Sequence, residues 1–149
     1  MDLKNYAKKE KIKYFMVTYT DLFGVQRAKL VPASAISGMQ KDGAGFAGFA
    51  SWLDMTPAHP DMLAVPDSES VIKLPWKKDV AWLASNCMME NKLVDQAPRN
   101  VLNKAIARAK KGNMRVKTGV EAEFFLLTSD GLAISDPYDN AEKPCYDQQ

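Results

Sequence analysis

The sequence has little cysteine and histidine and no long hydrophobic run. Its 149 residues include two cysteines, Cys87 and Cys145, and one histidine, His59. Two cysteines exclude a zinc site built from cysteine alone and give no basis for a disulfide framework. No apolar stretch approaches the roughly 20 residues that a membrane helix needs. The basic N-terminus has no apolar core of a secretion signal, so we expect a cytoplasmic protein with no membrane partner.

An excess of one charge sign is also lacking. Twenty Lys and Arg residues stand against 18 Asp and Glu residues, a net charge of +2. This balance does not indicate a nucleic-acid partner. Apolar residues make up 46% and charged residues 26% of the chain. These are the values of a globular protein, and they argue against disorder, collagen and coiled coil.

The N-terminal part predicts a short helix and then a hairpin. Asp2 is suited to cap a helix over residues 2–12. Tyr14–Thr20 is rich in aromatic and β-branched residues, Asp21–Gly24 supplies a turn, and Val25–Val31 returns to Pro32. Alternating apolar runs on both sides of a glycine-containing turn are typical of a β-hairpin.

A glycine spacing of the dinucleotide-binding type occurs at Gly43, Gly45 and Gly48. That motif needs a strand before it and a helix after it, and here the flanks are charged or rich in proline and aromatic residues. We therefore reject the dinucleotide interpretation. Residues 54–70 contain three prolines and predict mainly loop, with His59 on the surface.

The C-terminal part predicts strands around one long helix. Strands are expected over Val71–Leu74, over Val80–Met89 with Cys87 in the core, and over Val116–Leu127. Pro98 near its start and Gly112 after its end mark the helix. Its apolar face comprises Val101, Leu102, Ala105, Ile106 and Ala109. The composition changes near Glu90–Gln96, which predicts domains over residues 1–90 and 91–149.

Two acidic residues interrupt the last predicted strand. Side chains alternate along a strand, so Glu121 and Glu123 would share one face, about 6.7 Å apart. At an effective dielectric constant of 20, their repulsion is about 2.5 kcal/mol. A divalent cation such as Mg²⁺ or Mn²⁺ would compensate for it. The alternative is a half-exposed strand whose solvent face happens to be acidic.

At Gly119–Leu127 the sequence resembles a metal-binding strand of the glutamine synthetase family. The hairpin Val17–Val31 is similar to that family's N-terminal β-grasp domain, and Asp61–Asp67 and Val80–Cys87 to its later strands. Pro98-Arg99 matches the start of the catalytic domain. The terminal stretch SDPYDNAEKPCYDQQ resembles the type III-like branch that includes γ-glutamylmethylamide synthetases.

The resemblance implies an α+β fold: a β-grasp-like N-terminal domain followed by the truncated beginning of a catalytic domain. It implies a ligase of glutamine biosynthesis and nitrogen metabolism, which joins glutamate to ammonia or an amine with ATP as co-substrate. It also implies two Mg²⁺ or Mn²⁺ ions, with Glu121 and Glu123 as ligands of one each, and a homo-oligomer with active sites between subunits. We identify no catalytic or nucleotide-binding residue in this chain, which we expect to be inactive alone.

One departure concerns the amine. The family places an ammonium-binding aspartate in a Phe-Asp-Gly motif, and a gap-free count matches it to Phe46-Ala47-Gly48. Ala47 then stands in the amine site without a carboxylate. The alternatives are a γ-glutamyl ligase for an alkylamine or a polyamine and, in another class, a non-catalytic β-grasp interaction module.

Overall fold

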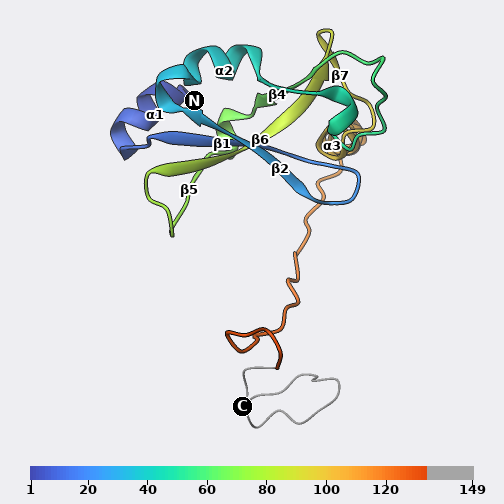
Figure 1. Ribbon diagram of the computed structural model, residues 1–149. Coiled ribbons are helices and arrows are strands. Elements are labelled where there is room, and N and C mark those ends of the chain that lie inside the picture. The colour runs from blue at the N-terminus through green and yellow to red at the C-terminus, as the bar shows by residue number, and fades with distance from the viewer. Residues whose placement is uncertain (134–149) are drawn as a thin grey trace. The chain divides into compact units, whose positions relative to one another are not determined.

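The computed structural model describes residues 1–133 (Figure 1). The stretch SDPYDNAEKPCYDQQ, with Cys145, lies outside these residues. The chain divides into two compact units, Met1–Arg115 and Val116–Gln149. The domain boundary expected near residue 90 stays a prediction.

The first unit begins with the predicted helix and hairpin, and both are confirmed. Helix α1 spans Leu3–Glu10, and Oδ1 of Asp2 accepts hydrogen bonds from its first turn, from the N–H groups of Lys4 and Asn5. Strands β1 (Tyr14–Thr20) and β2 (Gln26–Pro32) pair antiparallel. Gly24 closes their turn with a φ of 79°, a conformation that glycine adopts without strain.

Strand β6 organises the sheet. The elements after β2 are η1 (Ala33–Ala35), α2 (Ile36–Asp42), β3 (Ala44–Phe46), η2 (Gly48–Ala50), β4 (Met62–Pro66), η3 (Ser68–Ser70), β5 (Ile72–Lys73), β6 (Val80–Met89), β7 (Lys92–Leu93) and α3 (Pro98–Lys111). The main strand order is β2-β1-β6-β4-β3, and β5 and β7 also pair with β6. The β1–β6 pair is parallel and the others are antiparallel. This confirms the expected α+β, β-grasp-like fold.

The core lies between the sheet and two helices. Helices α1 and α2 lie along one face of the sheet (Figure 1). The side chains of Leu3 and Ile36 belong to one buried cluster with Phe15, Val17 and Leu83, and all five are fully buried. Burying a side chain of this size contributes about 1.5–3 kcal/mol. The core position expected for Cys87 is confirmed, and burial raises the pKa of its thiol to about 12.

The loop that the prolines predict for residues 54–70 is wrong in its middle, where the strand implied by the resemblance at Asp61–Asp67 is present. Strand β4 lies there between β3 and β6, with Ala64 opposite Cys87 and Pro66 opposite Ser85. Alternate residues of β4 are buried. Pro66 is tolerated because it ends the strand, where its missing N–H interrupts no further pairing. The proline content therefore marked the ends of a strand rather than its absence.

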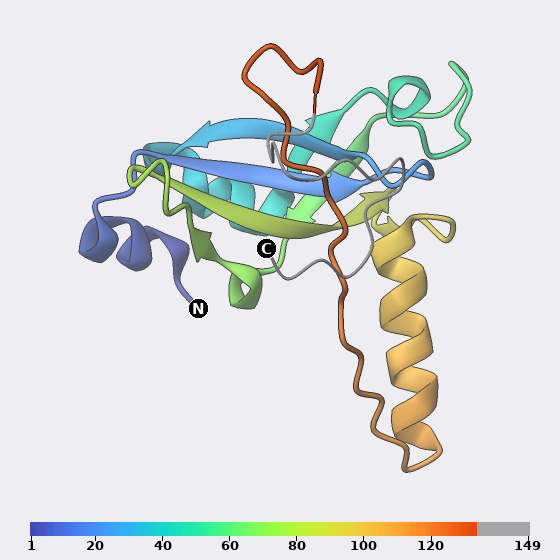
Figure 2. The same cartoon turned by 90° about the horizontal axis from the view of Figure 1, so that it is seen from below.

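Helix α3 begins and ends as predicted, but its apolar face is not covered. Val101, Leu102 and Ile106 are 50%, 55% and 42% exposed. Asn100 is fully buried, and its Nδ2 donates to the carbonyl oxygens of Cys87 and Val94 at 2.7 and 2.8 Å. The helix is thus attached to the sheet at its start, and it runs away from the sheet (Figure 2).

The predicted strand Val116–Leu127 is wrong for this structure. The segment lacks strand structure apart from an isolated bridge at Leu127. Val120, Phe124 and Phe125 are 93%, 76% and 67% exposed. A strand needs a neighbour to take its backbone N–H and C=O groups, and no described strand pairs with this segment. Among residues 1–133, no helix is both long and apolar enough to cross a membrane.

Candidate functional site

Ala47 lies at the junction between β3 and η2. Its backbone has a φ of −59° and a ψ of 121°, and its carbonyl oxygen accepts a hydrogen bond from the N–H of Ala50 at 3.1 Å. The residue is exposed. We call residues 45–53 around it the Ala47 segment. The contacts of this segment show what holds its methyl group in place.

Tyr19 on β1 contacts the segment on both sides of Ala47. Its hydroxyl donates to the carbonyl oxygen of Ser51 at 3.0 Å. Its ring meets that of Phe46 edge-on, with centroids 5.0 Å apart and an angle of 84°. Burial raises the pKa of the Tyr19 hydroxyl to about 12, so it stays a neutral donor at ordinary pH.

Lys29 on β2 holds the start of the segment. Its Nζ donates to the carbonyl oxygen of Gly45 and lies 4.8 Å from the centroid of the Phe46 ring. An ammonium group over an aromatic face is attracted by the negative potential of the ring. The ring of Phe46 is thus contacted by the Tyr19 ring in a perpendicular arrangement and by Lys29 over its face.

The turn between β1 and β2 is built on Asp21, which is fully buried. Its Oδ1 accepts hydrogen bonds from the N–H groups of Phe23 and Val25, both at 2.9 Å, and its Oδ2 lies 2.7 Å from Nη2 of Arg27. Burial works to raise the pKa of this carboxyl. The hydrogen bonds and the charge of Arg27 outweigh it and hold the pKa below its ordinary value.

This turn contacts Trp52, near the end of the segment, through a backbone hydrogen bond and two side chains. The carbonyl oxygen of Trp52 accepts a hydrogen bond from the N–H of Leu22 at 3.2 Å. Its ring meets Phe23 edge-on at 5.5 Å and lies 5.8 Å from Cζ of Arg27. Trp52 has a φ of 56°, which is costly for a residue with a side chain. These contacts compensate for that strain.

Gly48 fits the segment against a neighbouring loop. It is buried, and a Cβ atom there would lie 2.5 Å from the carbonyl oxygen of Pro60. That is closer than real Cβ contacts, and the atom it meets is backbone, which moves little. The segment therefore requires glycine directly after Ala47.

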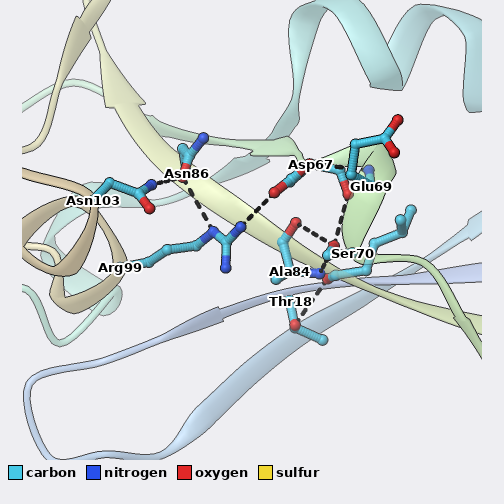
Figure 3. Close-up of polar contacts among 9 residues, drawn as sticks. Thr18, Asp67, Glu69, Ser70, Ala84, Asn86, Arg99 and Asn103 are labelled. Carbon is cyan, nitrogen blue, oxygen red and sulfur yellow. Dashed lines mark hydrogen bonds and ion pairs between the residues drawn. The ribbon is translucent and has the colours of Figure 1, made fainter. Parts of the chain in front are cut away.

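A second polar cluster lies at the start of α3 (Figure 3). Nη2 of Arg99 lies 2.5 Å from Oδ2 of Asp67, and its Nε donates to Oδ1 of Asn86 at 3.2 Å. Asn103 donates to the same Oδ1 at 3.1 Å. Asp67 follows β4 and Asn86 belongs to β6, so Arg99 joins the helix to two strands.

Glu121 and Glu123 lie in the second unit, in an exposed segment without strand pairing. Carboxylates are suitable ligands for a hard divalent ion. However, no three His, Cys, Asp or Glu side chains within residues 1–133 gather closely enough to hold a metal ion. The described residues therefore do not form a metal centre by themselves, and the ligand role of the two glutamates stays a prediction.

Comparison with known proteins shows whole-chain similarity. A glutamine synthetase of Rhizobium leguminosarum bv. phaseoli is 67% identical over all 149 residues. The chain belongs to the glutamine synthetase family. A glutamate–methylamine ligase of Methyloversatilis universalis is 34% identical over 98% of this chain. A solved structure described as a GmaS/ADP complex is 56% identical over 99% of the chain, with a TM-score of 0.91.

These matches cover all or nearly all of this chain but only part of each relative. The chain spans about a third of the length of the family members it matches, 34% in each of the three cases. No protein-family model matches the chain. The family and the fold are thus shown for this segment of glutamine synthetase-like sequence.

Sequence reasoning missed the residues that hold Ala47. The sequence predicts Asp21 as part of a turn and Arg27 as part of a strand, and it does not indicate that the two side chains pair. A polar pair on either side of a tight turn is a usable signal for such an ion pair. The bond from Tyr19 to Ser51 joins residues 32 positions apart. No local pattern indicates it.

Proposed function

We propose that this chain is part of an ATP-dependent ligase that joins glutamate to a small alkylamine in preference to ammonia. Ala47 carries the proposal. It is exposed at the position that the resemblance assigns to an ammonium-binding aspartate. Its methyl group offers no charge to ammonium and leaves room for one or two carbon atoms.

The energetics favour a substituted amine at such a site. A carboxylate close to an ammonium ion contributes roughly 1–4 kcal/mol, depending on how well water screens the pair. Alanine removes this attraction. An alkylamine recovers binding through apolar contact at about 0.8 kcal/mol for each buried methylene. The glutamate–methylamine ligase among the relatives supports this class of acceptor.

The remaining parts of the proposal concern the whole protein. Glu121 and Glu123 each provide a carboxylate for a divalent ion, Mg²⁺ or Mn²⁺, and the other ligands come from residues beyond those described. ATP is the co-substrate, which the ADP named for the solved relative supports. The protein is a cytoplasmic homo-oligomer with its active sites between subunits.

A chimera tests the amine preference. This chain replaces the aligned third of the Rhizobium leguminosarum glutamine synthetase, and kcat/KM is measured for methylamine and for ammonium. We expect the chimera to favour methylamine. Ala47→Asp is expected to shift the ratio at least tenfold toward ammonium, which corresponds to about 1.4 kcal/mol.

Ala35→Asp is the matched control because it adds the same charge at an exposed residue of η1. It should leave the ratio within twofold. A chimera that favours ammonium and does not respond to Ala47→Asp would refute the proposal. A chimera that assembles but forms no amide with either amine would favour the non-catalytic module.

A further inference from the structure

We infer that Tyr19 is a positioning residue for the amine site, because its hydroxyl and ring fix the two sides of the Ala47 segment. This inference rests on the proposed function of Ala47. It adds a residue of β1 that acts on the site through its contacts with Phe46 and Ser51.

The first step is the contact after Ala47. Ser51 ends η2, and its Oγ donates to the carbonyl oxygen of Gly48 at 2.6 Å. Its N–H donates to the same oxygen at 3.1 Å. The carbonyl oxygen of Ser51 accepts the hydrogen bond from Tyr19. Ser51 thus closes the turn through Gly48 and connects it to the sheet through Tyr19. The hydroxyl of Tyr19 therefore fixes the position of the turn relative to the sheet.

The second step is the contact before Ala47. The Tyr19 ring packs edge-on against Phe46, the residue that precedes Ala47. Tyr19 itself is 3% exposed, and on β1 it lies opposite Arg27 of β2, one residue beyond the last position that pairs with β6. A buried side chain on paired strands has few alternative rotamers. Tyr19 is therefore a rigid support, and Ala47 is held between two contacts with it.

The third step separates this role from general stability. Tyr19→Phe keeps the ring and its packing against Phe46 and removes only the hydroxyl. The carbonyl oxygen of Ser51 then loses this donor, and η2 is expected to shift or to open more often. If the loss of this hydrogen bond affects only the turn, it should change KM for the amine and leave KM for the other substrates unchanged.

Amide hydrogen exchange on this 149-residue chain gives the first measurement. We expect Tyr19→Phe to speed exchange at the Ala50 and Ser51 amides about five- to tenfold, while amides of β6 keep their rates. Tyr14→Phe is the matched control, because Tyr14 lies on the same strand but is 43% exposed. It should change none of these rates. Unchanged exchange at Ala50 and Ser51 in Tyr19→Phe would overturn the inference.

Steady-state kinetics of the chimera give the second measurement. Tyr19→Phe should raise KM for the amine severalfold and leave KM for ATP and for glutamate within twofold. A uniform fall in kcat with a lower Tm would show a merely structural role and overturn the inference. If Ala47→Asp changes amine selectivity but Tyr19→Phe does not affect KM for the amine, the positioning role fails while the proposed function stands. If Ala47→Asp has no effect either, the proposed function fails as well.

Discussion

Nη2 of Arg99, in the first turn of α3, lies 2.5 Å from Oδ2 of Asp67, the residue that follows β4. Both side chains are partly buried, with exposed fractions of 28% and 33%. Arg99 also reaches Asn86 on β6. The direction in which α3 leaves the sheet therefore depends on the ion pair with Asp67 and the hydrogen bond to Asn86, as well as on the buried Asn100.

We expect Arg99→Ala to lower the free energy of unfolding by about 1–2 kcal/mol, because a charge-assisted hydrogen bond and a second acceptor are lost. Urea unfolding measures the change, and a double-mutant cycle with Asp67→Ala isolates the pair. Lys104→Ala is the control, because the pair of Lys104 with Asp95 is largely exposed. Its effect should stay below about 0.5 kcal/mol. Equal effects of the two substitutions would contradict the importance of the Arg99 contact.

Two glycines should respond to alanine with opposite signs. Gly48→Ala forces a Cβ against the carbonyl oxygen of Pro60 and should destabilise the chain by about 1–3 kcal/mol. Gly38 lies inside α2 with open space at its Cβ position. Alanine there should stabilise by about 0.5–1 kcal/mol through helix propensity. Thermal unfolding of both variants checks this. A Gly48→Ala protein as stable as wild type would contradict the expectation, because it would show that the loop containing Pro60 moves to make room for the Cβ atom.

Asp21 should make stability depend on pH at the acidic end. Its pKa is held below the ordinary value in the folded state. The stabilisation from its carboxylate is therefore present above the unfolded pKa and is lost as the pH falls through the folded pKa. We expect Asp21→Asn to unfold at lower urea concentration than wild type at pH 7, with a difference that shrinks below about pH 4.

Asp42→Asn is the comparison for this pH series, since Asp42 is exposed at the end of α2. The urea concentration at the midpoint of its unfolding should be close to that of wild type at every pH. A gap between Asp21→Asn and wild type that stays constant from pH 7 to pH 3 would contradict the role of the Asp21 carboxylate.

The exposed aromatic residues of the second unit should promote self-association. Phe124 and Phe125 are 76% and 67% exposed, next to exposed Leu126 and Leu127. Contiguous apolar surface of this kind drives association. Sedimentation velocity of the 149-residue chain should show larger species as concentration rises, and Phe124→Ser with Phe125→Ser should reduce them. Lys117→Ser should not, and a wild-type chain that stays monomeric at every concentration would contradict the expectation.

Local patterns were sufficient where an element's own residues decide its structure. Asp2 capping α1, the turn at Gly24, and Pro98 and Gly112 at the ends of α3 are contacts or conformations within a few residues, and all were predicted. Local pattern predicts loop where strand β4 lies, because the strand's partners, β3 and β6, are distant in sequence, and only the family resemblance at Asp61–Asp67 indicates a strand there. Val116–Leu127 shows the opposite error. Its apolar alternation predicts which side chains a strand would bury, but a strand also needs a neighbouring strand to pair with, and the alternation does not provide one. The supports of Ala47 were missed because the bond from Tyr19 to Ser51 depends on the completed sheet.

The parallel pairing of β1 with β6 also constrains when the fold can form during synthesis. Tyr14 lies opposite Val80 and Thr18 opposite Ala84, so β1 lacks its central neighbour until the ribosome has released β6. Until then the chain has only the β1–β2 hairpin and short helices, which are weakly stable alone. Tyr19 and the Ala47 segment are made early, but the sheet that holds them is completed late. Slow translation before β6 would therefore prolong the exposure of the β1 edge to other chains.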